Sequence, residues 1–299
     1  MELSIIIVNW NGKKLMGQCI QSIKNSISSI NYEIIVVDNG SSDGSVEYLE
    51  VNFKDVLIIK NDKNYGFAHA NNQGMERAEG EYLLLLNSDT IVQKNAIEKC
   101  IGRIKRDSRI GVLGCRLLNQ DGSLQPSCYN FNSLKNSILF KTRLINFIPK
   151  EERYKYEVRI KSFDYVSELE VNYVCGAFMM MPRSLVEKIG KLDESFFMYA
   201  EEADFCKRAK KCGYKILFYP EAEIIHLGGG SSKTINEITE KRRIVSRLKF
   251  IKKHNGNTYY SIYRVMSLAD AMMKAIFSTA CRRGVYKAKI KAICSMKYE

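Results

Sequence analysis

Residues 3–12 read LSIIIVNWNG, an unbroken apolar run that ends abruptly in polar residues. Short runs rich in Ile and Val are typical of strands that are covered on both faces of a sheet. No basic stretch precedes this run and no small-residue cleavage site follows it, so we expect a buried strand rather than a signal peptide. Four similar runs predict further strands at Glu33–Val37, Val56–Ile59, Tyr82–Leu86 and Gly111–Leu117.

Segments long enough for helices separate these runs. They are Leu15–Ser28, Ser45–Phe53, Ala68–Ala78 and Ala96–Asp107. The alternation of strands and helices predicts an α/β fold with a mainly parallel central sheet flanked by helices. Ligands bind such sheets beyond the carboxyl ends of the strands, because loops and helix N-termini meet there. The loops that follow the strands are therefore the candidate site.

The second half of the chain is less regular. Residues 120–170 are polar, aromatic and aperiodic, which predicts a variable insertion, and order returns at Val171–Met181. From Asn236 the pattern is helical to about residue 280, with a break at residues 255–257. Between these parts we expect one helix and two strands, at Glu201–Cys212, Lys215–Tyr219 and Glu223–His226.

Composition sets the broad class of the protein, and the charge is concentrated at one end. Hydrophobic residues make up 45% of the chain, which excludes a disordered protein. The nine cysteines include no C-x-x-C pair, so we expect reduced thiols in a cytosolic protein. Residues 241–299 hold 15 basic and 2 acidic side chains, whereas residues 1–240 hold 31 of each. A neutral body with a basic extension predicts an anionic partner, which can be a phospholipid surface, a nucleic acid or an acidic protein.

The basic extension has two parts. Residues 241–253 combine basic residues with spaced apolar ones, which predicts a helix packed on the body of the protein with a solvated basic face. Ser261–Ala280 is apolar but contains Arg264, Asp270 and Lys274, and these charges argue against a membrane-spanning helix. Its polar residues share one helical face, which suits a helix lying in a lipid interface. We therefore expect residues 241–299 to dock on an anionic membrane surface. We expect no nucleic acid partner, because no binding module is recognisable.

Polar residues follow each strand of the predicted sheet. The first strand ends at Asn9 and the second at Asp38, while the third runs into Asn64 and Gly66 and the fourth into residues 87–89. A carboxylate such as Asp38 can accept a hydrogen bond from a pyrimidine N3–H or a ribose hydroxyl. Asp, Asn and Ser are also ordinary turn and N-cap residues, so any one of these loops alone favours a structural role. Four in succession on one sheet edge favour a nucleotide site.

Asp89 and His226 are candidate metal ligands. Asp89 comes just beyond a buried run, where a carboxylate suits Mg²⁺ or Mn²⁺ if phosphate oxygens supply the other ligands. The alternative for Asp89 is a helix N-cap. His226 opens the glycine-rich loop Leu227–Ser232, which lets a ligand approach the backbone, although a lone histidine there is more often structural. His69 and His254 have no such setting, and we expect both to be structural.

Glu201, Glu202 and Asp204 place three carboxylates in one helical turn. The simplest interpretation is an acidic first turn that the helix dipole favours. The preceding residues, 196–199, are apolar and would wall a pocket. A carboxylate against an apolar wall has a raised pKa, as a general base requires.

Taken together, these segments resemble glycosyltransferase family 2, the inverting enzymes with the GT-A fold, and most closely its rhamnosyltransferase-like branch. The matching stretches are IIVNWNG (6–12), VVDNGSSDGS (36–45), NYGFAHANNQG (64–74), LNSD (86–89), VCGA (174–177), FFMYAEEAD (196–204) and the His226 loop. The resemblance implies a GT-A catalytic domain over residues 1–235, with a donor-binding half to about residue 118 and an acceptor-side half from about 119. Residues 236–299 would form a basic helical C-terminal extension.

The resemblance also implies roles for individual residues. Glu202, at the second position of the family's E-D pair, would be the catalytic base. Asp89 would be the metal ligand of the D-x-D motif, with His226 as its partner. Residues implied to bind the donor are Val8, Asn9, Asp38, Asn64, Gly66, Asn87, Ser88 and Asp89. Residues implied to border the sugar and acceptor are Gly176, Ala177 and Glu201.

Two residues depart from the family's pattern. Asn87 replaces the first acid of D-x-D, which leaves metal binding more dependent on diphosphate oxygens. Glu202 replaces an aspartate with a side chain that is one methylene longer. The function implied is a metal-dependent (Mg²⁺ or Mn²⁺) inverting transfer of a hexose, with rhamnose as one candidate. The donor would be a nucleotide-diphosphate sugar and the acceptor a hydroxyl of a lipid-linked or polysaccharide molecule, at the inner face of the membrane.

Other functions remain open at this point. One is a catalytically silent protein that only binds sugar nucleotide. Another is a protein that binds an anionic surface or nucleic acid through its basic extension. A dinucleotide-binding enzyme is disfavoured, because residues 9–12 lack the G-x-G-x-x-G pattern.

Overall fold

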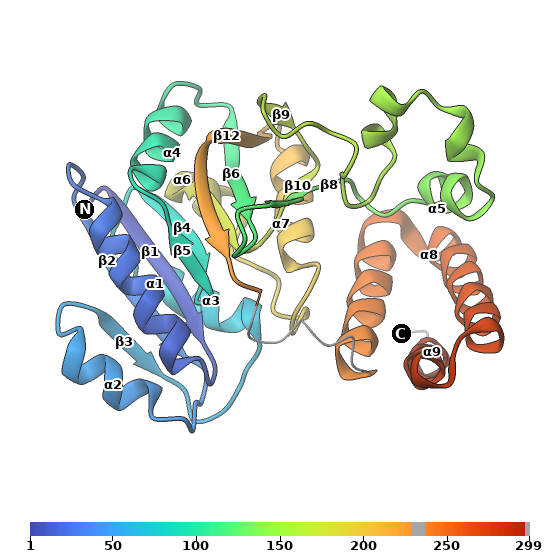
Figure 1. Cartoon of the computed structure of the whole chain (residues 1–299), viewed down its shortest axis with the longest axis horizontal. Coiled ribbons are helices and arrows are strands. Elements are labelled where there is room, and N and C mark those ends of the chain that lie inside the picture. The colour runs from blue at the N-terminus through green and yellow to red at the C-terminus, as the bar shows by residue number, and fades with distance from the viewer. Residues whose placement is uncertain (229–236, 297–299) are drawn as a thin grey trace.

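The structure is a computed structural model of the 299-residue chain, and it describes residues 1–228 and 237–296 (Figure 1). The elements of the first half are β1 (Leu3–Asn9), α1 (Lys13–Ser26), β2 (Tyr32–Asp38), α2 (Ser45–Asn52), β3 (Leu57–Lys60), α3 (Phe67–Arg77), β4 (Tyr82–Asn87), β5 (Thr90–Val92), α4 (Ala96–Lys105) and β6 (Ile110–Leu118). Every strand and helix predicted for this half is present, with ends shifted by at most two residues. The short strand β5 was not predicted.

The second half has more short elements than its sequence pattern indicates. They are β7 (Leu124–Gln125), β8 (Cys128–Tyr129), α5 (Leu134–Lys141), η1 (Leu144–Phe147), η2 (Lys150–Lys155), β9 (Leu169–Glu170), β10 (Tyr173–Val174), β11 (Phe178–Pro182), α6 (Arg183–Ile189), α7 (Glu201–Lys211), β12 (Lys215–His226), α8 (Glu237–Phe277) and α9 (Ala280–Ser295). The region expected to be an aperiodic insertion is therefore built of defined elements. The two strands predicted on either side of residue 221 are one strand, β12, with an irregular register between Tyr219 and Glu223.

The central sheet is mixed, with a parallel set at one edge and helices on both faces. Its order is β3-β2-β1-β4-β11-β6-β12-β5, with β7 beside β6 and β9 beside β12. The strands β3, β2, β1 and β4 are parallel, and β11 enters antiparallel between β4 and β6. The register pairs Asn9 with Asp38 and Val8 with Asn87. This alignment places the polar strand ends at one edge of the sheet, as predicted.

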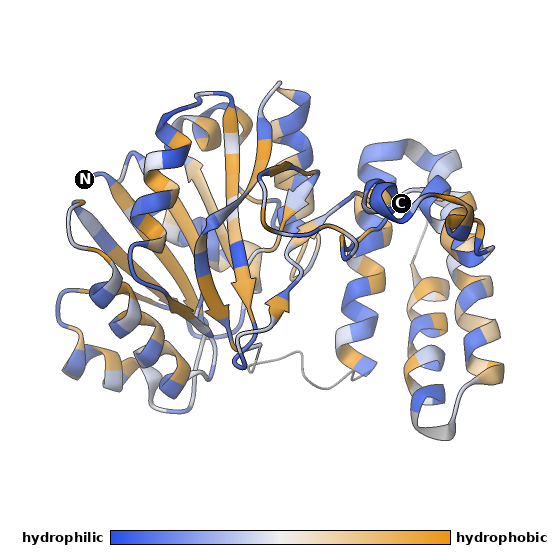
Figure 2. Ribbon diagram, turned by 45° about the horizontal axis from the view of Figure 1, so that its top comes forward, coloured by the Kyte–Doolittle hydropathy of each residue, from blue (hydrophilic) through white to orange (hydrophobic). Residues whose placement is uncertain are grey.

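Alternate residues of the central strands enter two separate cores, because successive side chains of a strand point to opposite faces. On β1, Ile5 and Ile7 pack in the core that includes α1 and α4, while Ile6 packs in the core that includes α3 and α7. Figure 2 shows the strands as mostly hydrophobic and the helices as mixed.

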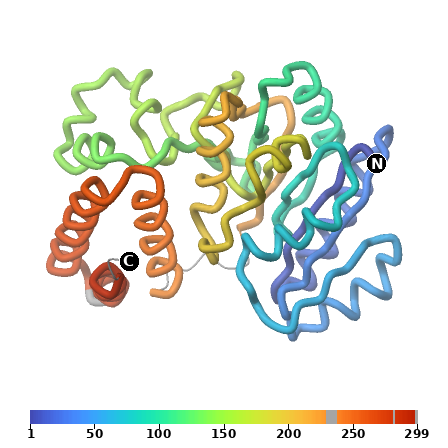
Figure 3. The backbone as a smooth tube through the Cα atoms, turned by 180° about the vertical axis from the view of Figure 1, so that it is seen from behind, coloured from blue at the N-terminus to red at the C-terminus, as the bar shows by residue number. Residues whose placement is uncertain are grey.

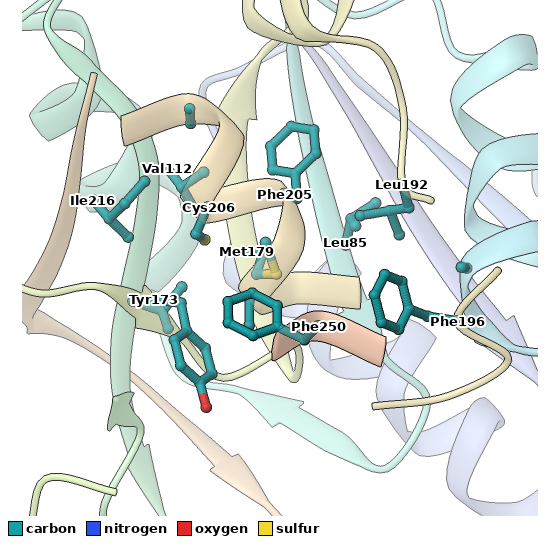
Figure 4. Packing of buried hydrophobic residues seen from close by; sticks show 14 of the residues in the cluster. Leu85, Val112, Tyr173, Met179, Leu192, Phe196, Phe205, Cys206, Ile216 and Phe250 are labelled. Carbon is teal, nitrogen blue, oxygen red and sulfur yellow. The ribbon is translucent and has the colours of Figure 1, made fainter. Parts of the chain in front are cut away.

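The C-terminal extension shares the second of these cores. Ile244, Leu248 and Ile251 of α8 are buried there, and Phe250 lies in the same cluster as Phe205 of α7 (Figure 4). This confirms the predicted helix packed on the body of the protein. The predicted break is also present, since Gly256 has a non-helical backbone with a φ of 81° inside α8. The predicted helix start, Asn236, lies outside the described residues.

The extension and the α5 region form one end of the molecule, opposite the N-terminal end that holds α2 and β3 (Figures 1 and 3). The Lys141 side chain at the end of α5 donates to the Met266 carbonyl of α8 at 2.9 Å, and the Leu134 N–H donates to the Tyr259 hydroxyl. Within the described part of the chain, no helix has the length and apolar character needed to span a membrane.

Candidate active site

Seven of the predicted site residues meet in one cavity of about 810 Å³ at the carboxyl end of β4. They are Asn87, Asp89, Gly176, Ala177, Glu201, Glu202 and His226. Asn87 ends β4, His226 ends β12 and Glu202 lies in the first turn of α7. The cavity therefore brings together side chains from elements that are far apart in the sequence.

The other predicted donor residues lie in neighbouring loops and, among the described residues, do not line this cavity. They are Val8, Asn9, Asp38, Asn64, Gly66 and Ser88. The buried Asp38 carboxylate accepts one hydrogen bond from Asn9 Nδ2 and another from the Ser41 N–H, each at 2.8 Å. These bonds join the loops after β1 and β2, and each carboxylate oxygen keeps a further lone pair for a ligand.

Asn39 organises the donor-side loops, a role that nothing in the sequence indicated beyond its place in the DNGSS stretch. Its side-chain Nδ2 donates to Asn64 Oδ1 and to the Gly66 carbonyl, each at 3.1 Å. Its Oδ1 accepts from the Tyr65 N–H. The loops after β2 and β3 are thereby held together, with Asn64 and Gly66 as bonded partners.

Gly66 allows this donor-side loop to reach the segment that leads into α7. A Cβ atom at Gly66 would lie 2.5 Å from the Phe197 carbonyl oxygen, and its φ of +96° is rarely adopted by other residues. The next residue, Phe67, donates its N–H to the same oxygen at 2.7 Å. The contact couples the donor loops to the helix that carries Glu202.

Asp89 and His226 form a polar pair on one side of the cavity. Asp89 Oδ1 lies 3.2 Å from His226 Nε2, and β5 pairs with β12 so that Thr90 stands opposite His226. His226 Nδ1 lies 2.6 Å from Gln125 Oε1. Because Oε1 only accepts, Nδ1 carries a proton, and in the neutral ring the Nε2 lone pair faces Asp89.

This pair suits a divalent cation. A neutral imidazole Nε2 beside a carboxylate oxygen is an appropriate donor set for Mg²⁺ or Mn²⁺. In residues 1–228 and 237–296, no group of three or more His, Cys, Asp or Glu side chains could hold a metal ion. The remaining ligands would therefore come from water or from the donor's phosphates. Most of the glycine-rich loop expected to border this pair lies outside the described residues.

Glu201 and Glu202 stand on the other side of the cavity, after a turn in which Tyr199 and Ala200 have φ values of 70° and 71°. Burial raises the pKa of both carboxyl groups, and the neighbouring Glu202 charge raises the pKa of Glu201 further. Each residue has a buried Oε2 atom without a hydrogen-bond partner among the described residues. A carboxylate in this state is suited to accept a proton.

The wall beside Glu202 differs in part from the prediction. Met198 and Tyr199 line the cavity as expected, but Phe196 is buried in the core (Figure 4). Tyr129 and Tyr173 also line the cavity, and their rings stack with centroids 4.9 Å apart. The other aromatic lining residues are Phe67, Phe131 and Phe250. Tyr129 and Tyr173 lie in short strands that local sequence patterns did not indicate.

Asp204 has a structural role, distinct from that of its two glutamate neighbours. Its fully buried carboxylate contacts Arg208 at 2.9 Å, Lys253 at 2.6 Å and His254 at 2.7 Å. Burial alone would raise the pKa of Asp204, but hydrogen bonds from these three side chains outweigh burial and hold the pKa well below its usual range. His254 is thus structural, as predicted. His69 contacts Glu194 on the surface.

The sheet and its edge cavity define the GT-A fold. A match to the glycosyl transferase family 2 model over residues 4–190 shows that the chain belongs to this family. The family resemblance stated from the sequence is therefore confirmed.

Two curated relatives and one solved structure illustrate this membership. The chain is 30% identical over 216 residues to the low-salt glycan biosynthesis hexosyltransferase Agl10 of Haloferax volcanii, covering 70% of this chain and 62% of that protein. It is 26% identical over 207 residues to the N-acetylglucosaminyl-diphospho-decaprenol L-rhamnosyltransferase of Mycobacterium tuberculosis, covering 64% and 66%. The chain thus spans less than two thirds of the length of either relative.

The solved structure shows the similarity in fold. The mannosyltransferase PcManGT of Pyrobaculum calidifontis, in complex with GDP-Man and Mn²⁺, matches with a TM-score of 0.58 at 14% identity. The match covers 98% of this chain and 84% of that one.

Proposed function

We propose that this chain is an inverting glycosyltransferase that moves a sugar from a nucleotide-diphosphate donor to an acceptor hydroxyl. The observation that carries the proposal is the shared cavity of Asp89, His226 and Glu202. One side offers a carboxylate and an imidazole for the phosphate end of the donor, and the other offers a carboxylate with a raised pKa. The relatives named as a hexosyltransferase and a rhamnosyltransferase support a hexose, with rhamnose as one candidate.

The reaction is a single displacement in which Glu202 is the base. Glu202 accepts the proton of the acceptor hydroxyl while that oxygen forms a bond to the anomeric carbon of the sugar. The bond from the anomeric carbon to the diphosphate oxygen breaks, and its electron pair leaves with the nucleotide diphosphate. Attack from the face opposite the leaving group inverts the anomeric configuration.

Asp89 and His226 would hold a divalent cation, Mg²⁺ or Mn²⁺, with further ligands from the donor diphosphate. When bound, the cation acts as a Lewis acid that stabilises charge on the leaving phosphate. Gln125 supports this role by keeping the His226 ring in one orientation and one tautomer. Asn87 contributes an uncharged amide 3.4 Å from His226 Nε2.

The remaining donor residues lie around the cavity. Asp38 would bind the base, and Val8, Asn9, Asn64 and Gly66 would line the nucleotide pocket. Ser88 would lie beside the diphosphate, and Gly176, Ala177 and Glu201 would border the sugar and the acceptor. The hydrogen bonds through Asn39 support these assignments, because they hold the donor loops in one arrangement.

The acceptor is proposed to be lipid-linked, with a polysaccharide as the alternative, and the protein to lie on the inner, cytoplasmic face of a membrane. On α8, Val265, Ile276 and Phe277 are exposed apolar side chains. The neighbouring Arg282 and Arg283 of α9 are exposed and basic. Apolar side chains next to cationic ones suit a surface of anionic lipid. A domain boundary near residue 235 separates the proposed catalytic domain from this extension.

The test is glycosyl transfer by the full chain, with a panel of sugar nucleotides and Mn²⁺. We expect release of nucleotide diphosphate from one donor of the panel. Glu202→Gln should lower turnover by about two to four orders of magnitude, the usual contribution of a general base. Its Kd for the donor should stay nearly unchanged. A Glu202→Gln variant as active as the wild type would refute this assignment, and donor binding without turnover by the wild type would indicate a silent sugar-nucleotide-binding protein.

A further inference from the structure

A second cavity, of about 660 Å³, adjoins the candidate active site. It lies between α5, α8 and α9, in the end of the molecule that the extension forms (Figures 1 and 3). Asn132, Val158, Arg159 and Arg247 line both cavities. The two cavities therefore meet at a junction that contains two arginines.

The junction is electropositive. Arg159 is anchored there, since its Nε and Nη2 donate to the Pro126 carbonyl at 3.1 and 3.0 Å. Within the described parts of the chain, no hydrogen bond or ion pair engages the Arg247 guanidinium. Six basic and two acidic residues line the second cavity. Two guanidinium groups that line the same junction, neither of them paired with a carboxylate among the described residues, suit phosphate oxygens.

The junction also lies close to the proposed base. The pKa of Tyr173 is raised, first by burial and then by the Glu202 charge, while the Arg247 charge lowers it. The pKa of Tyr129 is likewise raised mainly by burial, and the Glu202 charge raises it while the Arg159 charge lowers it. The geometry agrees, because both tyrosines line the active-site cavity together with Glu202, Arg159 and Arg247.

Beyond the junction the cavity has an apolar lining from three helices. Its apolar members are Phe140, Ile244, Met266, Ala271, Met273 and Ile293. Phe140 and Met273 are exposed, so this end of the cavity opens to the surface. From the base outwards, the order is a carboxylate, two arginines and a channel lined by apolar side chains together with lysines.

We infer that the second cavity binds the lipid chain of a lipid-diphosphate acceptor, with the diphosphate at Arg159 and Arg247. This inference rests on the proposed function, because the sugar of such an acceptor would then present its hydroxyl to Glu202. An amphiphile of this kind matches the order of groups along the two cavities: a hydroxyl at the base, phosphates at the arginines and a chain in the channel. Apolar chains gain free energy in proportion to the area they bury.

The test uses farnesyl diphosphate as the probe, with the full chain, without membranes and with EDTA present. Binding is measured by calorimetry against inorganic diphosphate and farnesol. We expect farnesyl diphosphate to bind at least about tenfold more tightly than either, since each lacks one half of the recognition. If inorganic diphosphate bound as tightly as farnesyl diphosphate, the lipid site would be overturned. If farnesol bound as tightly as farnesyl diphosphate, the diphosphate site would be overturned.

Matched variants locate the binding. Arg247→Gln should weaken binding of farnesyl diphosphate by about tenfold. Arg106→Gln, which changes an exposed arginine on another surface, should not weaken it. Met273→Gln should weaken binding of farnesyl diphosphate about fivefold, whereas Met272→Gln should not. Both methionine side chains are exposed, but only Met273 lines the cavity. Thermal unfolding within a few degrees of the wild type shows that each variant is folded. Wild-type affinity in both Arg247→Gln and Met273→Gln would overturn the inference.

Donor turnover, scored separately, distinguishes the two proposals. A chain that turns over a sugar nucleotide but does not bind farnesyl diphosphate refutes only the lipid site. A chain that binds the probe at these residues but turns over no sugar nucleotide refutes the proposed function.

Discussion

Glu201 and Glu202 are adjacent in sequence but meet different surroundings at the start of α7. Both line the cavity, but Glu201 is buried whereas Glu202 is partly exposed. Burial raises the pKa of each carboxyl group because a charged carboxylate is poorly solvated there. At the residue scale, the role of a base thus depends on placement against an aromatic wall rather than on the acidic turn itself.

The pH dependence of activity follows from the raised pKa of Glu202. Below that pKa the carboxyl group is protonated and cannot accept the acceptor's proton, so kcat/KM should fall as the pH falls. We expect the acidic limb of a pH–rate profile to inflect above 4.5, the ordinary value for glutamate. A profile that stays flat down to pH 4.5, with the protein still folded, would contradict this role.

Metal dependence tests the Asp89–His226 pair. Asp89→Asn and His226→Ala should each raise the Mn²⁺ concentration needed for half-maximal donor binding, by about tenfold or more. Gln125→Leu should have a smaller effect in the same direction, because Gln125 orients the His226 ring but would not itself contact the cation. Calorimetric titration of the donor at several Mn²⁺ concentrations measures this dependence of donor binding on Mn²⁺. His69→Ala, a surface histidine paired with Glu194, is the control and should titrate like the wild type.

The helices α7 and α8 are joined by buried charge as well as by apolar packing. Asp204 of α7 is fully buried and contacts Lys253 and His254 of α8, while the Ser246 hydroxyl donates to the Met198 carbonyl at 2.9 Å. At the element scale, the extension therefore supports the helix that carries Glu202. Removal of the Asp204 charge would take the carboxylate partner from Arg208 and His254, whereas Lys253 would keep Asp193.

Asp204→Asn should destabilise the protein by about 3–5 kcal/mol at pH 7. The folded-state pKa of Asp204 is depressed, so its contribution is fully present above the unfolded pKa, about 4, and is lost as the pH falls further. The difference between variant and wild type should therefore shrink below about pH 4. Urea unfolding at several pH values measures this difference in the free energy of unfolding. Asp55→Asn, which removes an exposed partner of Lys24, should change stability by under about 1 kcal/mol.

Exposed apolar side chains from two distant segments lie at one end of the whole molecule. Leu144 and Phe147 follow α5, and Val265, Ile276 and Phe277 belong to the second half of α8. Arg264, a polar residue of this part of α8, is directed towards α9 and donates to the Ile293 carbonyl at 3.1 Å. A surface with this composition suits contact with lipid.

Membrane docking should depend on that apolar surface. The triple variant Val265→Ser, Ile276→Ser, Phe277→Ser should bind anionic vesicles at least about tenfold more weakly than the wild type, because three apolar side chains no longer enter the interface. Sedimentation with anionic vesicles measures the bound fraction of each variant. The control variant Val51→Ser with Leu57→Ser removes exposed apolar side chains from α2 and β3, at the opposite end of the molecule (Figure 1). It should bind anionic vesicles as the wild type does. Equal sedimentation of the triple variant and the wild type would refute docking through this surface.

The sequence alone was sufficient for the donor half of the fold and for the main candidates in the site. Apolar runs and helix-length segments are local patterns, so the strands β1 to β4 and the helices α1, α3 and α4 could be predicted to within two residues. Asp89, Glu202 and His226 could be singled out because each lies within two residues of the end or start of a regular element, beside a distinctive motif.

Only the tertiary structure decided what surrounds those residues. Gln125 meets His226 across 101 positions of the chain, and Tyr129, Tyr173, Arg159 and Arg247 come from four separate segments. No local period marks such side chains, because their neighbours are determined by the packing of short strands and loops and not by the residues next to them in sequence. The composition of the cavity wall, the second cavity and the coupling of α8 to α7 therefore depend on the complete fold.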